Sequence, residues 1–139
     1  MPAQAWSLHP KLDADAVTLG DLPLSRVLLA KDANYPWLLL VPRRADVREI
    51  IDLEATDQAC LMEEIALASR ALQAVAACDK LNVAAIGNIV PQLHVHVVAR
   101  RHSDAAWPRP VWGTAPAIAY AAADLEALSA AIKRALWPG

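Results

Sequence analysis

The segment from Gly87 to Arg101 constrains the fold more than any other part of this chain. It contains three polar side chains in strict alternation with three branched aliphatic ones: Gln92, His94 and His96, and Leu93, Val95 and Val97. Side chains on a β-strand point alternately to its two faces, so each set shares a face. Residues i and i+2 on one face lie about 6 to 7 Å apart. The sequence therefore predicts a strand with one buried face and two imidazoles and an amide on the other.

Composition excludes several classes of protein. The 139 residues are predicted to form one domain, 1–139. With 13 basic and 15 acidic residues and no basic run, nothing favours a nucleic-acid or anionic-membrane partner. The apolar runs are too short to cross a bilayer, and the first ten residues lack the features of a signal peptide. Because Cys60 and Cys78 are isolated, we expect a cytoplasmic protein.

Strand signals occur in five short stretches. Residues 1–15 are polar and punctuated by proline, and we expect a loosely held lead-in there. Runs of β-forming residues then predict these strands: Val17–Leu19, Leu24–Ala30, Trp37–Val41, Leu81–Ile86 and Leu93–Ala99. The run Trp37–Val41 is apolar throughout, which indicates a strand covered on both faces and hence central in its sheet.

Two stretches carry helical periodicity. The first spans residues 56–78, with Thr56 or Asp57 as its expected cap. Its predicted buried stripe consists of Leu61, Ile65, Ala68, Leu72 and Val75. The positions off this stripe are polar: Glu63, Glu64, Arg70 and Gln73. A helical turn is possible at Val47–Ile51, and a second helix is predicted over Asp124–Leu136. Residues 102–139 thus form an irregular segment followed by a helix, and the whole pattern predicts an α+β domain.

Three chemistries fit the paired imidazoles. A metal could bind His94 and His96, with His102 as a third ligand, although further ligands at a familiar spacing are missing. The pair could also act in acid–base or in nucleophilic catalysis at phosphorus. Gly87 allows close backbone approach, and nearby amides suit phosphate oxygens: Asn82, Asn88 and Gln92. Phosphoryl or nucleotidyl transfer without metal or cofactor is the interpretation that these neighbours favour. His9, like His102, is otherwise expected to be an ordinary surface residue.

The segment Asn82–Arg100, NVAAIGNIVPQLHVHVVAR, resembles the signature of the histidine-triad (HIT) nucleotide-binding proteins. The earlier run YPWLLLVPRR, residues 35–44, is similar to their central strand. The resemblance implies an antiparallel sheet of about five strands with a long helix and a C-terminal helix, paired as a homodimer. It also implies binding of a purine nucleotide or nucleotide conjugate, with hydrolysis or transfer at the α-phosphate.

The same resemblance assigns roles to individual residues. His94 matches the nucleophile, which acts through a nucleotidyl-imidazole intermediate. His96 matches the imidazole that holds phosphate oxygens, and Asn82 matches an asparagine that supports the phosphate site. The turn with Asp32 and Asn34 lies near the position where the family contacts the ribose.

Two positions depart from the family pattern. Gln92 stands where the first histidine of the triad is expected, and an amide can donate a hydrogen bond but cannot carry a proton at neutral pH. Ile89 replaces a usual polar residue. A nucleotide-binding module with little turnover therefore stays open as an alternative, and a metal-dependent enzyme as a lesser one.

Three tryptophans also have open roles. Trp37 could flank the base or belong to the core. Trp107 and Trp112 lie in the irregular segment, and they could pack at a dimer interface, over the site, or in the core beneath a C-terminal extension.

Overall fold

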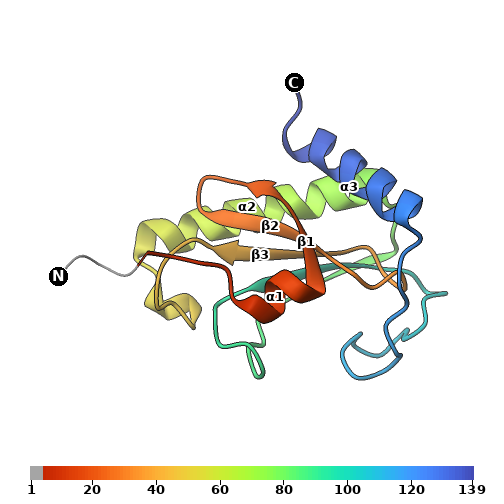
Figure 1. The fold of residues 1–139 in the computed structure, drawn as a ribbon, viewed down its shortest axis with the longest axis horizontal. Coiled ribbons are helices and arrows are strands. Elements are labelled where there is room, and N and C mark those ends of the chain that lie inside the picture. Colours follow the sequence, from red (N-terminus) through yellow and green to blue (C-terminus); the bar gives the residue numbers. More distant parts are fainter. Residues whose placement is uncertain (1–4) are drawn as a thin grey trace.

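The computed structural model describes residues 5–139, which form an antiparallel sheet with helices, as predicted. The strands are β1 Ala16–Asp21, β2 Ser25–Ala30, β3 Trp37–Pro42, β4 Lys80–Ala84 and β5 Val95–Arg100. The helices are α1 Pro10–Asp15, the 3-10 turn η1 Ile50–Asp52, α2 Ala55–Val75 and α3 Ala122–Leu136. Figure 1 shows the strands between α1 on one side and α2 with α3 on the other. The described residues thus form an α+β fold.

The strand order β1-β2-β3-β5-β4 places β3 in the middle of the sheet. Every neighbouring pair is antiparallel. The residues Leu38–Val41 are buried, which agrees with the central position that their continuous hydrophobicity predicted. In β5 all six residues are buried, and His96 lies opposite Leu39 of β3 and Ala84 of β4. The histidine strand is therefore held from both sides.

Helices α2 and α3 cover one face of the sheet. The core there includes Leu61 and Leu72 of α2 and Ile132 of α3, packed against Val95 and Val97 of β5. Because Val95 and Val97 face these helices, the strand's period of two turns His96 toward the opposite face. Among residues 5–139, no helix has the length and apolarity needed to cross a membrane.

The N-terminal segment is more ordered than the expected lead-in. Residues 1–4 lie outside the described part, but residues 10–15 form α1, and Leu12 is buried. Pro10 occupies the first turn, where its fixed φ suits a helix, and the backbone N–H of Lys11 donates to His9 Nδ1. His9 is therefore a helix cap rather than an ordinary surface residue. Pro10 thus marks the start of a helix, which the composition of the segment did not indicate.

Helix α2 differs from prediction in its ends and in one buried acid. It begins after Glu54, and neither Thr56 nor Asp57 caps it. Glu64, expected on the polar face, is buried because its carboxylate accepts the backbone N–H groups of Leu24 and Ser25 at 2.8 and 3.0 Å. Such a paired carboxylate can lie on a packed helix face. It ties α2 to the turn before β2.

Candidate active site

The two imidazoles lie side by side on the face of the sheet opposite α2. Their ring centroids are 4.9 Å apart in an edge-to-face arrangement, and each residue is 7% exposed. His96 is part of β5, whereas His94 lies in the extended residues just before it. The structure thus brings together the pair that the alternation predicted, even though the regular strand starts one residue after His94.

A backbone carbonyl determines the tautomer of His94. Its Nδ1 lies 2.7 Å from the carbonyl oxygen of Gln92. Because a carbonyl oxygen only accepts, Nδ1 must carry the hydrogen of the neutral ring. The lone pair is then on Nε2, on a residue that lines the cavity described below. His94 can therefore act as a nucleophile or base through Nε2.

An indole determines the opposite tautomer of His96. The indole Nε1–H of Trp37 donates to His96 Nδ1 at 3.0 Å, so the hydrogen of this ring is on Nε2. Burial, with a further contribution from His94, lowers the pKa of His96 from 6.5 to about 4. At neutral pH the ring is uncharged and offers Nε2–H as a donor. The pair thus combines one lone pair with one N–H donor.

Trp37 and Trp112 form an aromatic wall around His96. The centroid of the Trp112 ring is 5.1 Å from that of His96 and 5.9 Å from that of Trp37, both edge to face. Trp112 therefore packs over the site. Trp107 does not: its ring lies against His102 and the guanidinium of Arg100. The sequence left the roles of both tryptophans open, and no local pattern predicted the hydrogen bond from Trp37 to His96.

A cavity of about 640 Å³ opens beside the two imidazoles. Its walls come from α1, the end of β2, the loop before β5 and Trp112. Five of the predicted site residues line it: Asp32, Gly87, Asn88, His94 and His96. Gly87 has a φ of 65°, in the left-handed region that favours glycine. Ile89 also lines the cavity and is 81% exposed.

The other three predicted site residues are engaged with the protein. Asn82 Oδ1 accepts from the guanidinium of Arg100 at 2.8 Å. The Asn34 amide donates to the carbonyl of Pro116 at 2.9 Å. The Gln92 amide bonds to the backbone of residues 7 and 9. None of these three side chains is among those that line the cavity.

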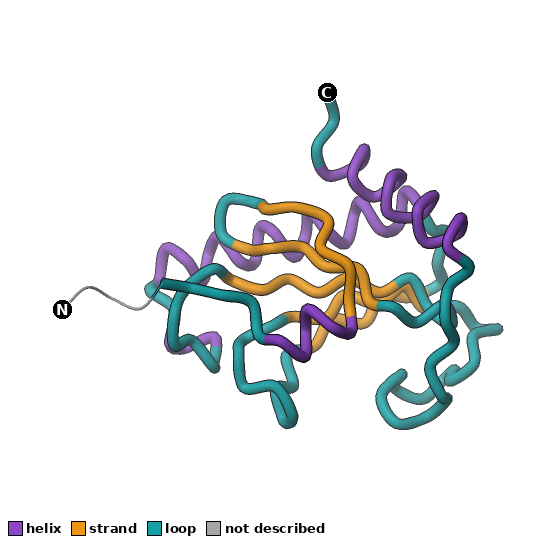
Figure 2. Tube along the Cα trace, in the orientation of Figure 1, coloured by secondary structure: helices purple, strands orange, loops and turns teal. Residues whose placement is uncertain are grey.

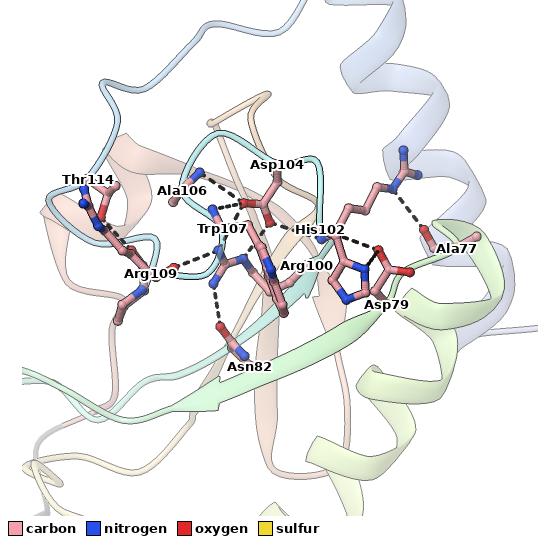
Figure 3. Close-up of polar contacts among 12 residues, drawn as sticks. Ala77, Asp79, Asn82, Arg100, His102, Asp104, Ala106, Trp107, Arg109 and Thr114 are labelled. Atoms are coloured by element: carbon pink, nitrogen blue, oxygen red, sulfur yellow. Dashed lines mark hydrogen bonds and ion pairs between the residues drawn. The ribbon is translucent and has the colours of Figure 1, made fainter.

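Arg100 organises a buried polar cluster at the far end of β5 (Figure 3). Its guanidinium, on a residue only 1% exposed, bonds twice to Asp104, at 2.7 and 3.1 Å, and once to the carbonyl of Arg109. Burial alone would raise the pKa of the Asp104 carboxyl, but bonds from Arg100 and from three backbone N–H groups lower it to about 2. The cluster holds the segment that carries Trp112 against the sheet.

Metal ligation has little support in the described geometry. His102, the third ligand that a metal site would need, lies beside Asp79 and Trp107 rather than near His94. Within residues 5–139, no group of three or more His, Cys, Asp or Glu side chains is arranged to hold a metal ion.

A second cavity of about 250 Å³ lies beside the first, and its lining includes Arg48, Ile50, Ile51, Ile86 and His94. Ile86, Gly87 and His94 line both cavities. Figure 2 shows that the loop which carries them and the loop after β5 extend from the same side of the sheet. The two cavities thus share these three residues as part of their walls.

Comparison with known proteins identifies the family. The family model of the HIT domain matches residues 11–103. The chain belongs to the HIT family. It is 59% identical to a histidine triad protein from Bradyrhizobium japonicum, with a TM-score of 0.95, over 96% of this chain and 100% of that one.

Two further structures of HIT proteins share 40% identity. One, from Sinorhizobium meliloti, has a TM-score of 0.91 over 94% of this chain and 97% of its own. The other, from Marinobacter aquaeolei, has a TM-score of 0.92 over 96% and 97%. No curated protein matches the chain significantly. HIT proteins are generally nucleotide-binding hydrolases or transferases.

Proposed function

We propose that this HIT protein hydrolyses or transfers at the α-phosphate of a purine nucleotide conjugate, with His94 as the nucleophile. The observation that carries the proposal is the bond between His94 Nδ1 and the Gln92 carbonyl, which leaves Nε2 unprotonated in a residue that lines the cavity. A nucleophilic imidazole needs a free lone pair and a partner that stabilises the charge it gains. Gln92 supplies that partner through its backbone.

The reaction takes place in two steps. His94 Nε2 attacks phosphorus, and an N–P bond forms while the bond from phosphorus to the leaving nitrogen or oxygen breaks. The leaving group departs with the electron pair and takes a proton from solvent. The imidazole becomes cationic, and the Gln92 carbonyl stabilises its Nδ1–H. Water then attacks phosphorus, loses a proton, and releases the nucleoside monophosphate and neutral His94; an acceptor alcohol or amine in place of water gives transfer.

His96 stabilises the charge on the phosphoryl oxygens. Its Nε2–H is the donor that remains after Trp37 occupies Nδ1. A hydrogen bond to a charged oxygen contributes about 1.5 to 3 kcal/mol. The low pKa of His96 keeps this donor uncharged at neutral pH.

The rest of the cavity suits a nucleotide. We assign Asp32 to the ribose hydroxyls and the backbone at Gly87 and Asn88 to the phosphate, since all three line the cavity. Asn82 acts through Arg100 rather than on the phosphate directly. The smaller cavity, which shares Gly87 and His94 with the larger one, offers space for the leaving group.

A nucleotide-binding module with little turnover is the second candidate. The observation that favours it is the engagement of the Gln92 amide with the N-terminal backbone, which leaves no acid at that position for the leaving group. Binding of AMP without release from a conjugate would distinguish this candidate from the first.

We also propose a homodimer that forms through strand β4. It is an edge strand, paired on one side only with β5. Val83 on this strand is 49% exposed, and Ile50, Ile51 and Ile86 lie exposed around the cavity near its end. An open edge with apolar neighbours favours pairing with another strand. A second copy of the chain offers such a strand.

The test of catalysis uses an adenosine phosphoramidate and mass spectrometry. We expect the wild type to release AMP and to carry a trapped adenylyl adduct on His94. The variant His94→Ala should lose at least about 10³-fold in turnover while it stays folded, because the nucleophile is removed. The exposed imidazole of His102 provides a matched control, and His102→Ala should keep wild-type turnover. Full activity of His94→Ala would refute the proposal, and binding without release would select the second candidate.

A further inference from the structure

The side-chain amide of Gln92 connects the histidine segment to the N-terminus. Its Nε2 donates to the carbonyl of Ser7 at 2.9 Å, and its Oε1 accepts the backbone N–H of His9 at 2.8 Å. The partners are 85 and 83 residues away in sequence. Both ends of the amide are therefore bonded to a segment that is more than 80 residues away in the sequence.

The segment that Gln92 holds is part of the cavity wall. Residues 7–15, termed here the N-terminal strap, include α1, which lines the cavity with Lys11, Leu12, Ala14 and Asp15. At the far end of the strap, Lys31 bonds to the backbone carbonyls of residues 14 and 15. The strap is thus fixed by Gln92 at its start and by Lys31 at its end.

The backbone of Gln92 also acts on the nucleophile. Its carbonyl oxygen is the partner of His94 Nδ1 at 2.7 Å. One residue therefore binds the strap through its side chain and orients His94 through its main chain. The side chain and the main chain of Gln92 thus make separate contacts, one with the cavity wall and one with the catalytic ring.

We propose that Gln92 is a positioning residue that keeps the N-terminal strap closed over the nucleotide cavity in register with His94. It is neither a phosphate ligand nor the donor of a proton to the leaving group. The part of this inference that concerns the nucleotide rests on the proposed function; the part that concerns the strap does not.

An amide suits this role better than a titratable group. The two bonds need one donor and one acceptor at the same time, and an amide supplies both at any ordinary pH. A carboxylate has no donor for the Ser7 carbonyl. A histidine loses its acceptor when it is protonated, near its ordinary pKa of about 6.5. Gln92 therefore keeps the strap closed independently of pH.

The first test measures amide hydrogen exchange of residues 5–15 in Gln92→Glu. At pH 7 the introduced carboxylate cannot donate to Ser7, so we expect exchange about tenfold faster than in the wild type, the effect of one lost hydrogen bond. Near or below the ordinary glutamate pKa of about 4.3, the protonated carboxyl regains a donor, and exchange should return toward that of the wild type at the same pH. Gln73→Glu, on the exposed side of α2, is the matched control and should leave the strap unchanged.

The second test uses the uncharged variant Gln92→Ala with the phosphoramidate substrate. We expect KM to rise about tenfold, with kcat changed less than about threefold, because the cavity wall loosens while His94 remains. Gln73→Ala is its control. A loss of kcat at unchanged KM would assign Gln92 to the chemistry and overturn the inference.

Unchanged exchange of the strap in Gln92→Glu at pH 7 would also overturn it. A wild type that neither binds AMP nor turns over the substrate would instead refute the proposed function. The exchange measurement would still decide whether Gln92 holds the strap.

Discussion

The two site histidines differ because each has a different partner on Nδ1. The Gln92 carbonyl requires a hydrogen on His94, whereas the Trp37 indole N–H forbids one on His96. The two rings lie next to each other on one face but offer different groups: His94 offers a lone pair on Nε2, and His96 offers an Nε2–H donor. The chemical asymmetry of the site comes from these two contacts and not from the histidines themselves.

Trp37→Phe tests this asymmetry. The phenyl ring keeps an aromatic side chain beside Trp112 but removes the N–H that donates to His96 Nδ1. In the wild type the indole N–H points at Nδ1 and opposes its protonation. Without that N–H, we expect the pKa of His96 to rise from about 4. We also expect kcat to fall about tenfold, since the donor tautomer is no longer enforced. Imidazole NMR titration and steady-state kinetics measure the two effects.

Trp107→Phe is the matched control, since Trp107 contacts Arg100 and His102 and not His96. It should change neither quantity. A titration of His96 in Trp37→Phe identical to that of the wild type would show that burial alone keeps the ring neutral.

The spacing of His94 and His96 was sufficient to predict their common face, because strand parity is a local property. Their Nδ1 partners were not predictable in the same way. The contact from Trp37 depends on the register of β3 against β5, and the one from Gln92 depends on a bend just before the strand. Sequence patterns carry neither register nor bends of this kind.

The loop after β5 owes its position to a buried ion pair. Arg100 and Asp104 join the end of the strand to the segment that leads to Trp112. Because the carboxyl also accepts the N–H groups of Arg101, Ala106 and Trp107, the pair satisfies both partners in a buried place. Trp112 can then reach His96 from a segment without regular structure.

The pH dependence of unfolding tests this ion pair. The pKa of Asp104 falls from 3.8 to about 2 on folding, so its stabilisation is present above about pH 4 and is lost as pH decreases toward 2. This difference corresponds to about 2 kcal/mol of the free energy of unfolding. We expect Asp104→Asn to lose about 2 to 4 kcal/mol at pH 7, and this loss to shrink between pH 4 and 2. Urea unfolding of both proteins across that range gives the difference.

The exposed carboxylate of Asp79 offers the control, and Asp79→Asn should cost less than about 1 kcal/mol at pH 7. Burial lowers the pKa of His96, so His96 destabilises the fold increasingly as pH decreases from about 6.5 to 4 and by a constant amount below that, equally in all three proteins. A loss in Asp104→Asn that stays constant down to pH 2 would contradict the assigned pKa.

Strands and long helices were predicted more successfully than the segments that complete the cavity. Continuous apolar runs located β3, and periodicity located α2 and α3, apart from their ends. Helix α1 was not predicted because its six residues, which begin with Pro10, are too few to carry a periodic signal. The burial of Glu64 was not predicted because its backbone partners, Leu24 and Ser25, are about 40 residues away in the sequence. Long-range contacts of this type decide where an isolated polar residue lies.

The sheet divides the molecule into a helical face and a chemical face. Helices α2 and α3 bury Val95 and Val97, while the N-terminal strap and the loop after β5 surround His94 and His96. The residue alternation that buries the valines in the core therefore also places the two histidines on the opposite face, at the cavity. At the sides of the sheet, β1 packs with α1 and α3, whereas β4 carries no further strand within residues 5–139.

This open side leads to a prediction about assembly. If two copies pair through β4, Val83→Asp places a carboxylate in the interface, and charged side chains on an edge strand oppose pairing. We expect light scattering coupled to size exclusion to give about twice the mass of one chain for the wild type and the mass of one chain for Val83→Asp. Thr18→Asp adds the same charge to an exposed position of β1 at the opposite edge, and it should remain a dimer. Dissociation by Thr18→Asp but not by Val83→Asp would place the interface at β1, and a monomeric wild type would remove the dimer altogether.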